Sequence, residues 1–329
     1  MTELTYRDAL RQALADAMTE DPDVVVIGEE VGRYGGAYGV TKDLIAQFGA
    51  ERVIDTPISE AAIVGAAVGA AMTGLKPVAE LMYVDFIGMT MDQLGNQAAK
   101  IRYMFGGQIG VPMVLRTQGG TGRSAGAQHS QSLEAYVLHT PGLRLAMPAT
   151  VADAYHLLRQ AIACPDPVVF IEHKALYTMK ETVDLTADPL PWGRAAVRRE
   201  GGDLVIVTYS RQLHHALDAA RQLGDRGIEA TVIDLRTLNP LDFDTIRERV
   251  NATGRAMVVS EGAMTAGVAA ELAARISEEC FDYLDDPVVR VAGEDIPISV
   301  STALEAGSVP GPTLIAETAA RMLEGRRAA

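Results

Sequence analysis

The stretch from residue 52 to residue 84, RVIDTPISEAAIVGAAVGAAMTGLKPVAELMYV, decides the fold class. It begins with a short apolar run (52–56), continues with an uncharged segment of small residues (61–75) and ends with a second apolar run (76–84). Apolar runs of this length are typical of buried strands, and the alanine-rich segment between them is long enough for a helix. The stretch therefore predicts a strand, a helix and a second strand in one parallel sheet.

The same alternation extends on both sides of this stretch. Further apolar runs that predict strands lie at 23–28, 111–117, 143–149 and 167–173. Segments between them, such as 89–105 and 151–163, have apolar residues at three- and four-residue spacing, which predicts helices. Buried strands separated by helices indicate a largely parallel sheet covered on both faces.

The alternation lapses at 186–203, where prolines and paired glycines interrupt the chain, and then resumes. Later strands are predicted at 204–210, 230–238, 256–263 and 287–293. We therefore predict an α/β protein of two domains, each with a largely parallel sheet flanked by helices, with limits of 1–190 and 200–329.

Composition and charge exclude several classes of protein. The chain has 329 residues with 48% hydrophobic and 22% charged residues, as ordinary globular proteins do, and a formal charge of −14 argues against nucleic acid or an anionic membrane as partner. Two cysteines, Cys164 and Cys280, are too few for a disulfide framework and indicate a reducing, cytoplasmic location. Residues 1–18 read as an amphipathic helix, and 61–75 is too short to span a membrane.

Common catalytic and nucleotide-binding motifs are missing from the sequence. It contains no GxxxxGK[ST] phosphate loop and no HExxH pair, and its one match to GxSxG, GRSAG at 122–126, has no helix opening behind it as a nucleophile elbow requires. Its glycine-rich segments at 28–40 and 116–132 do not fit the dinucleotide fingerprint. Among six histidines, only His129 lies in a glycine- and serine-rich loop after a predicted strand, where an acid or base would be recruited.

Glu60 is the only charged residue between Asp55 and Lys76. At a helix N-terminus a carboxylate is stabilised by the helix dipole, and Ser59 is a candidate cap, so Glu60 has a purely structural interpretation. The small residues that follow it fit either a close helix interface or ordinary packing within the domain, and the pattern favours ordinary packing. Spacing alone thus indicates a two-domain α/β enzyme or enzyme subunit.

Several longer motifs resemble one family. They are GEEVG, DTPISEAAIVGAAVGAA, DQLGNQAAKIRYMFGG, AGAQHSQSLEAY, PGLRLAMPAT, FIEHKALY and VIDLRTLNPLD, spread over about residues 5–325. Together they resemble the β subunit of the thiamine-diphosphate-dependent first component of the pyruvate, branched-chain 2-oxo acid and acetoin dehydrogenase complexes. The resemblance implies a transketolase-like fold, with an N-terminal pyrimidine-binding domain and the transketolase C-terminal domain.

The resemblance also implies roles for four residues. Glu60 matches the glutamate that bonds a ring nitrogen of the cofactor's aminopyrimidine and favours the imino tautomer that activates the thiazolium ring. Phe86 matches the aromatic residue that packs on the pyrimidine ring. Glu29 matches a glutamate of the same pocket. His129 matches the histidine near the substrate that assists acyl transfer to a lipoyl disulfide. An apolar setting suits Glu60, because desolvation raises the pKa of a carboxyl.

The family resemblance further implies partners and ions. The sequence has no GDG motif for Mg²⁺ and pyrophosphate, so thiamine diphosphate would be shared with an α subunit that carries Mg²⁺, in an α2β2 heterotetramer that transfers acyl groups to a dihydrolipoyl acyltransferase core. The family often binds a monovalent cation such as K⁺ in the segment matching 160–169. The candidate ligands here are Ala161, Cys164 and Asp166, although Cys164 and Pro165 interrupt the family's pattern.

Three functions follow from these observations. The first is a catalytic β subunit that decarboxylates a 2-oxo acid, with pyruvate as first choice, or cleaves acetoin. The second is a non-catalytic subunit of the same fold that docks an α chain or the acyltransferase. The third, a one-chain nicotinamide oxidoreductase, rests only on the α/β alternation. Glu60, Phe86 and His129 occurring together favour the first.

Overall fold

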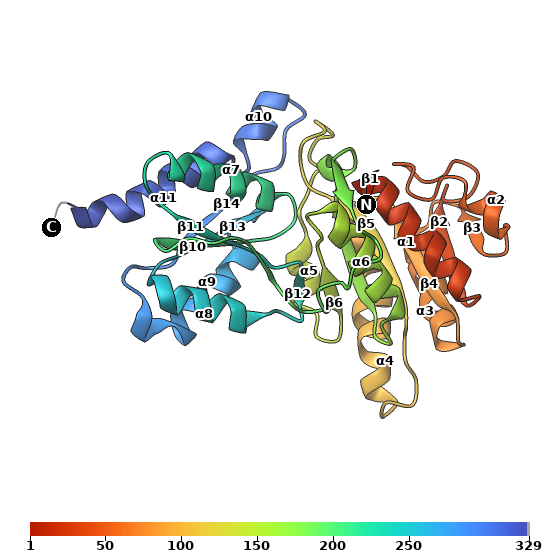
Figure 1. Cartoon of the computed structure of the whole chain (residues 1–329). Coiled ribbons are helices and arrows are strands. Elements are labelled where there is room, and N and C mark those ends of the chain that lie inside the picture. The colour runs from red at the N-terminus through yellow and green to blue at the C-terminus, as the bar shows by residue number, and fades with distance from the viewer. Residues whose placement is uncertain (328–329) are drawn as a thin grey trace. The chain divides into compact units, whose positions relative to one another are not determined.

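The computed structural model describes residues 1–327 (Figure 1). The chain divides into two compact units, of which the first comprises Met1–Gly119 and Tyr136–Trp192, and the second Gly120–Ala135 and Gly193–Ala329. The domain limits 1–190 and 200–329 stay predictions, and residues 328–329 lie outside the described residues.

The first unit is built on a parallel sheet. Its strands lie in the order β6-β7-β5-β4-β2-β3, and every pairing among them is parallel. The bounds are β2 Val24–Glu29, β3 Val53–Thr56, β4 Lys76–Leu81, β5 Val114–Gly119, β6 Arg144–Ala146 and β7 Val168–His173. The parallel sheet predicted from the apolar runs is thereby confirmed.

Helices cover both faces of this sheet. They are α1 Tyr6–Glu20, α2 Leu44–Phe48, α3 Glu60–Met72, α4 Ala99–Met104, α5 Glu134–Leu138 and α6 Val151–Ala163. Apolar side chains of α1 and α6 form one core with Val26, Val78 and Phe170. Strand residues that alternate with these, such as Ala79 and Leu115, are buried outside that core, so the opposite face is covered as well.

Two segments differ from the predicted pattern. The chain begins with a short strand, β1 Thr2–Thr5, which pairs antiparallel with β8 Lys180–Val183. The helix starts only at Tyr6 because the Thr5 side chain accepts a hydrogen bond from the Asp8 amide and caps it. The predicted helix at 89–105 is divided into the end of a 3₁₀ helix (η1, Val84–Thr90), a π-helix (η2, Asp92–Ala98) and α4.

The second unit contains the sheet β14-β13-β10-β11-β9, parallel except for the edge strand β9. Helices α7 and α11 lie on one face and α8 and α9 on the other (Figure 1). The strands of this sheet are β9 Ala196–Arg199, β10 Leu204–Thr208, β11 Ala230–Asp234, β13 Ala256–Ala263 and β14 Val289–Gly293, and a further short strand, β12 Thr237–Asn239, is not part of it. The helices are α7 Gln212–Gly224, α8 Phe243–Thr253, α9 Val268–Glu279, α10 Thr302–Gly307 and α11 Pro312–Arg327, with short 3₁₀ helices η3 Lys174–Leu176 in the first unit and η4 Phe281–Tyr283 in the second.

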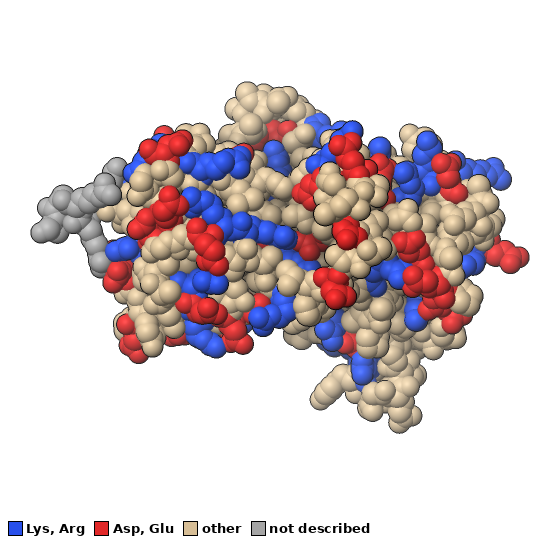
Figure 2. All heavy atoms as spheres, in the orientation of Figure 1, with Lys and Arg blue, Asp and Glu red and all other residues tan. Residues whose placement is uncertain are grey.

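The surface mixes charges of both signs. Acidic and basic side chains are interspersed over the face drawn in Figure 2, without a large area of one sign. Within residues 1–327, none of the helices combines the length and the apolar character that crossing a membrane requires. Cys164 and Cys280 are free thiols.

Candidate active site

Two predicted carboxylates meet at the carboxyl edge of the first sheet. Glu29 is the last residue of β2 and pairs in register with Thr56, the last residue of β3. Glu60 opens α3 four residues later. Burial raises the pKa of Glu29, and the charges of Glu60 and Glu30 raise it further. The Glu60 carboxylate is therefore close enough to Glu29 to raise the pKa of Glu29.

Glu60 is half-buried in the first turn of α3, where the helix dipole favours a negative charge. Ser59 occupies the cap position, but its side chain makes no capping hydrogen bond, so the structural interpretation of Ser59 as a cap is wrong. The interaction of the Glu60 carboxylate with the helix dipole is thus the part of the structural interpretation that remains.

Asp55 shapes the loop that follows Glu29. Its carboxylate accepts hydrogen bonds from the backbone amides of Gly32, at 2.6 Å, and Arg33, at 3.1 Å. A Cβ atom on Gly32 would lie 2.8 Å from Asp55 Oδ2, so a larger residue there would displace the Asp55 carboxylate from these amides. Sequence reasoning missed Asp55, although its place at the end of a buried strand was a signal.

Phe86 belongs to η1, which follows β4 and packs against α3, the helix that Glu60 opens. Its half-buried ring meets Tyr83 edge to face, with centroids 6.0 Å apart. Tyr83 in turn meets Tyr38 at 6.2 Å, and Tyr38 stacks on the buried Tyr177 at 4.9 Å. Phe86 thus belongs to an aromatic row that fixes its orientation from the interior of the unit.

Tyr177 of the aromatic row also contacts a buried ionic cluster. Arg116 on β5 donates to Glu80 Oε2 at 2.7 Å and to both carboxylate oxygens of Glu172 at 2.6 and 2.9 Å. Tyr177 donates its hydroxyl to Glu172 at 2.6 Å. Arg116 is 1% exposed and Glu172 0%. Burial raises the pKa of Glu80, and the nearby Arg116 charge opposes that rise. The cluster was not foreseen from the sequence.

The segment proposed to bind a monovalent cation contains two arginines bound to one aspartate. The Asp166 carboxylate accepts hydrogen bonds from Arg144 at 2.6 and 3.1 Å and from Arg102. Burial alone would raise the pKa of Asp166, but these hydrogen bonds bring it below its ordinary value. The Ala161 carbonyl accepts from the Cys164 amide. A cation at Asp166 would face two guanidinium groups, so the residues do not fit one.

This arrangement predicts that stability does not depend on K⁺. The thermal unfolding midpoint is expected to be the same in potassium chloride and in choline chloride at equal ionic strength, because the arginines already neutralise Asp166. Sodium chloride serves as the control for ionic strength. A midpoint that rises only with K⁺ would show that Ala161, Cys164 and Asp166 hold the ion after all.

His129 lies in the second unit, within Gly120–Ala135, whereas Glu29, Glu60 and Phe86 lie in the first. It is half-buried, and its backbone amide donates to the Gly126 carbonyl at 3.2 Å. The structure thus brings Glu29 and Glu60 together and packs the helix of Glu60 against the segment of Phe86. Within residues 1–327 no group of three or more His, Cys, Asp or Glu side chains is arranged to hold a metal ion.

Comparisons with known proteins cover nearly the whole chain. Residues 2–180 match the family "Transketolase, pyrimidine binding domain" and residues 193–315 match "Transketolase, C-terminal domain". A pyruvate dehydrogenase E1 component subunit beta of Rhizobium meliloti is 44% identical over 94% of this chain and 68% of its own length. A mitochondrial pyruvate dehydrogenase E1 component subunit beta-1 of Arabidopsis thaliana is 47% identical over 94% of this chain and 86% of its own length.

Two further matches differ in name. The beta subunit of an acetoin:2,6-dichlorophenolindophenol oxidoreductase of Cupriavidus necator is 43% identical over 98% of both chains. A solved structure described as a split gene transketolase, inactive beta4 tetramer, superposes with a TM-score of 0.80 over 97% of this chain and 98% of the other. At 22% identity this last match bears on the fold alone.

Proposed function

The chain belongs to the transketolase-like family of β subunits of the thiamine-diphosphate-dependent first component of 2-oxo acid dehydrogenase complexes, and we propose that it contributes the pyrimidine side of the cofactor site. The observation that carries the proposal is the proximity of Glu29, at the end of β2, and Glu60, the first residue of the helix that follows β3. In parallel sheets, ligands bind outside the carboxyl ends of the strands, where this pair lies.

The chemistry of these side chains fits an aminopyrimidine ring. Burial and the neighbouring Glu60 charge raise the pKa of Glu29. The Glu60 carboxylate, at the start of α3, can form a charge-assisted hydrogen bond with a weakly basic ring nitrogen and share its proton. Phe86, oriented by Tyr83, offers a ring face for packing. When bound, thiamine diphosphate supplies the electron sink for cleavage of the bond next to the substrate carbonyl.

Other parts of the site are assigned to a partner. Because the chain has no GDG motif, we assign Mg²⁺ and the pyrophosphate to an α subunit in an α2β2 heterotetramer.

His129 would face the substrate and assist acyl transfer to a lipoyl group on a dihydrolipoyl acyltransferase core. The two free thiols support a cytoplasmic location.

We propose pyruvate as the substrate, with acetoin as the second candidate. Both names occur among the relatives at similar identity, 44–47% for the pyruvate enzymes and 43% for the acetoin enzyme. Reconstitution with a GDG-bearing α chain and a lipoyl acyltransferase tests the choice, with reduced lipoyl groups as readout for pyruvate, branched-chain 2-oxo acids and acetoin. Turnover of none of these substrates by any such complex would overturn the catalytic proposal in favour of a docking subunit.

A further inference from the structure

The segment Gly120–Ala135 is here called the His129 loop. It has no helix or strand until α5 begins at Glu134. A backbone hydrogen bond from the Gly120 amide to the Gln131 carbonyl, at 2.9 Å, joins the two ends of this segment. Gly120, Gly122 and Gly126 have positive φ angles, and so does Ser124, at 51°. Such a glycine-rich segment has many alternative conformations, so contacts from outside must select one.

The first contact is a carboxylate at the start of the loop. Glu261, on β13, accepts the Thr121 backbone amide at 2.6 Å and the Thr121 hydroxyl at 2.9 Å. Arg211 donates to the same hydroxyl at 3.1 Å. Thr121 and Glu261 are both buried, so these bonds are shielded from water.

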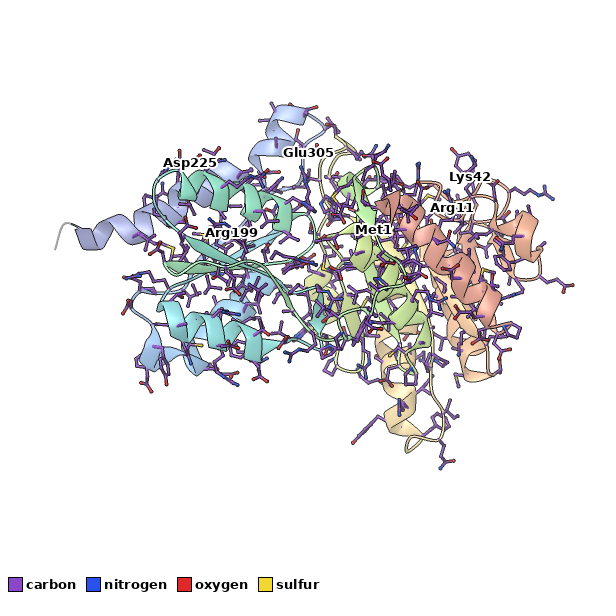
Figure 3. All side chains as sticks on the ribbon, in the orientation of Figure 1. Met1, Arg11, Lys42, Arg199, Asp225 and Glu305 are labelled. Carbon is purple, nitrogen blue, oxygen red and sulfur yellow. The ribbon has the colours of Figure 1, made fainter. Side chains whose placement is uncertain are left out.

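The second contact is Glu305, on the short helix α10 (labelled in Figure 3). Its carboxylate accepts the Gly122 amide at 3.0 Å, the Ser124 amide at 3.0 and 3.2 Å, and the Ser124 hydroxyl at 3.3 Å. Glu305 is 3% exposed although its neighbours on both sides, Leu304 and Ala306, are exposed. Its carboxylate is thus buried by the loop that it binds.

A third contact fixes the far end of the loop. Tyr209, which follows β10, donates its hydroxyl to Glu134 at 2.7 Å, and both side chains are buried. The Val300 side chain would lie 2.9 Å from a Cβ atom on Gly126, so residues next to α10 also touch the middle of the loop. The contacts fall on both sides of His129 in the sequence, at 121–126 and at 134.

We propose that Glu305 and Glu261 are positioning residues that hold the His129 loop in one conformation. Through them the rest of the second unit sets the position of His129 for acyl transfer. Hydrogen bonds from backbone amides to a carboxylate are about twice as strong as neutral ones, and a buried carboxylate without them is strongly disfavoured. The loop and the two glutamates therefore stabilise each other. The catalytic part of this inference rests on the role proposed for His129.

The test uses Glu305→Ala and Glu305→Gln in the reconstituted α–β enzyme. Removing the carboxylate is expected to speed amide hydrogen exchange in residues 120–131 by about tenfold or more and to leave β10 and β13 unchanged. Acyl transfer to lipoyl groups is expected to fall by about tenfold, more than reduction of a small artificial acceptor. Glutamine keeps the size of the side chain and one acceptor oxygen. Both effects are therefore expected to be smaller in Glu305→Gln than in Glu305→Ala. Glu294→Ala, at an exposed position of the same unit, is the control.

The outcomes separate the two proposals. Unchanged amide exchange in residues 120–131 of Glu305→Ala would show that Glu305 does not hold the His129 loop. Faster exchange with unchanged acyl transfer would show that Glu305 holds the loop but does not position His129 for the reaction. His129→Asn is measured in parallel. If this variant transfers acyl groups at the normal rate, the role proposed for His129 fails, whatever the exchange data show for Glu305.

Discussion

Glu60→Gln is expected to lower turnover of the assembled α–β enzyme by about 100- to 10,000-fold, the range for loss of a positioned acid–base group. Glutamine has nearly the same size but cannot share a proton with a ring nitrogen. Because Glu60 is half-buried at a helix start, the fold should tolerate the change. The measurement is the rate of decarboxylation at saturating cofactor and substrate.

Glu51→Gln is the matched control for this variant. Glu51 is exposed in the turn before β3, so the same loss of charge there should change turnover by less than about twofold. If Glu60→Gln also retained full turnover, the catalytic role of Glu60 would be refuted and the docking subunit would be the better description of the chain.

The largest effect on stability is expected for Arg116→Met. This change leaves Glu80 and Glu172 buried without their cation, which typically costs about 3–5 kcal/mol of the free energy of unfolding. Urea denaturation followed by circular dichroism measures the loss. Arg221→Met, which removes an exposed pair with Asp218, is expected to cost less than about 1 kcal/mol.

A triple variant distinguishes an uncompensated charge from simple loss of packing. Arg116→Met combined with Glu80→Gln and Glu172→Gln removes all three charges, and it should recover a large part of the stability lost in Arg116→Met. A triple variant that is less stable than the single variant would contradict this explanation of the cluster.

Much of the fold could be predicted from the sequence because buried parallel strands require continuous apolar runs. The runs at 52–56 and 76–84 became β3 and β4, and the small-residue segment between them became α3. The isolated charge of Glu60 and the motifs around it also led to the family, which the comparisons confirmed. These features are local, so the order of residues is enough to find them.

Contacts between distant residues could not be predicted in this way. Arg116 stands directly opposite Glu80 on the neighbouring strand, but only knowledge of the strand order reveals that pairing. The His129 loop belongs to the second unit because Glu261 and Glu305 bind it from 140 or more residues away. No periodicity along the chain encodes such contacts.

The central claim is that this chain holds half of a thiamine diphosphate site. It is tested most directly by calorimetric titration of magnesium–thiamine diphosphate into the chain alone and then into the chain co-expressed with a GDG-bearing α subunit. We predict binding only in the second titration, because in our proposal Glu29, Glu60 and Phe86 form the pyrimidine side of the site and the α subunit forms the rest. Tight binding to the chain alone would contradict the half-site account.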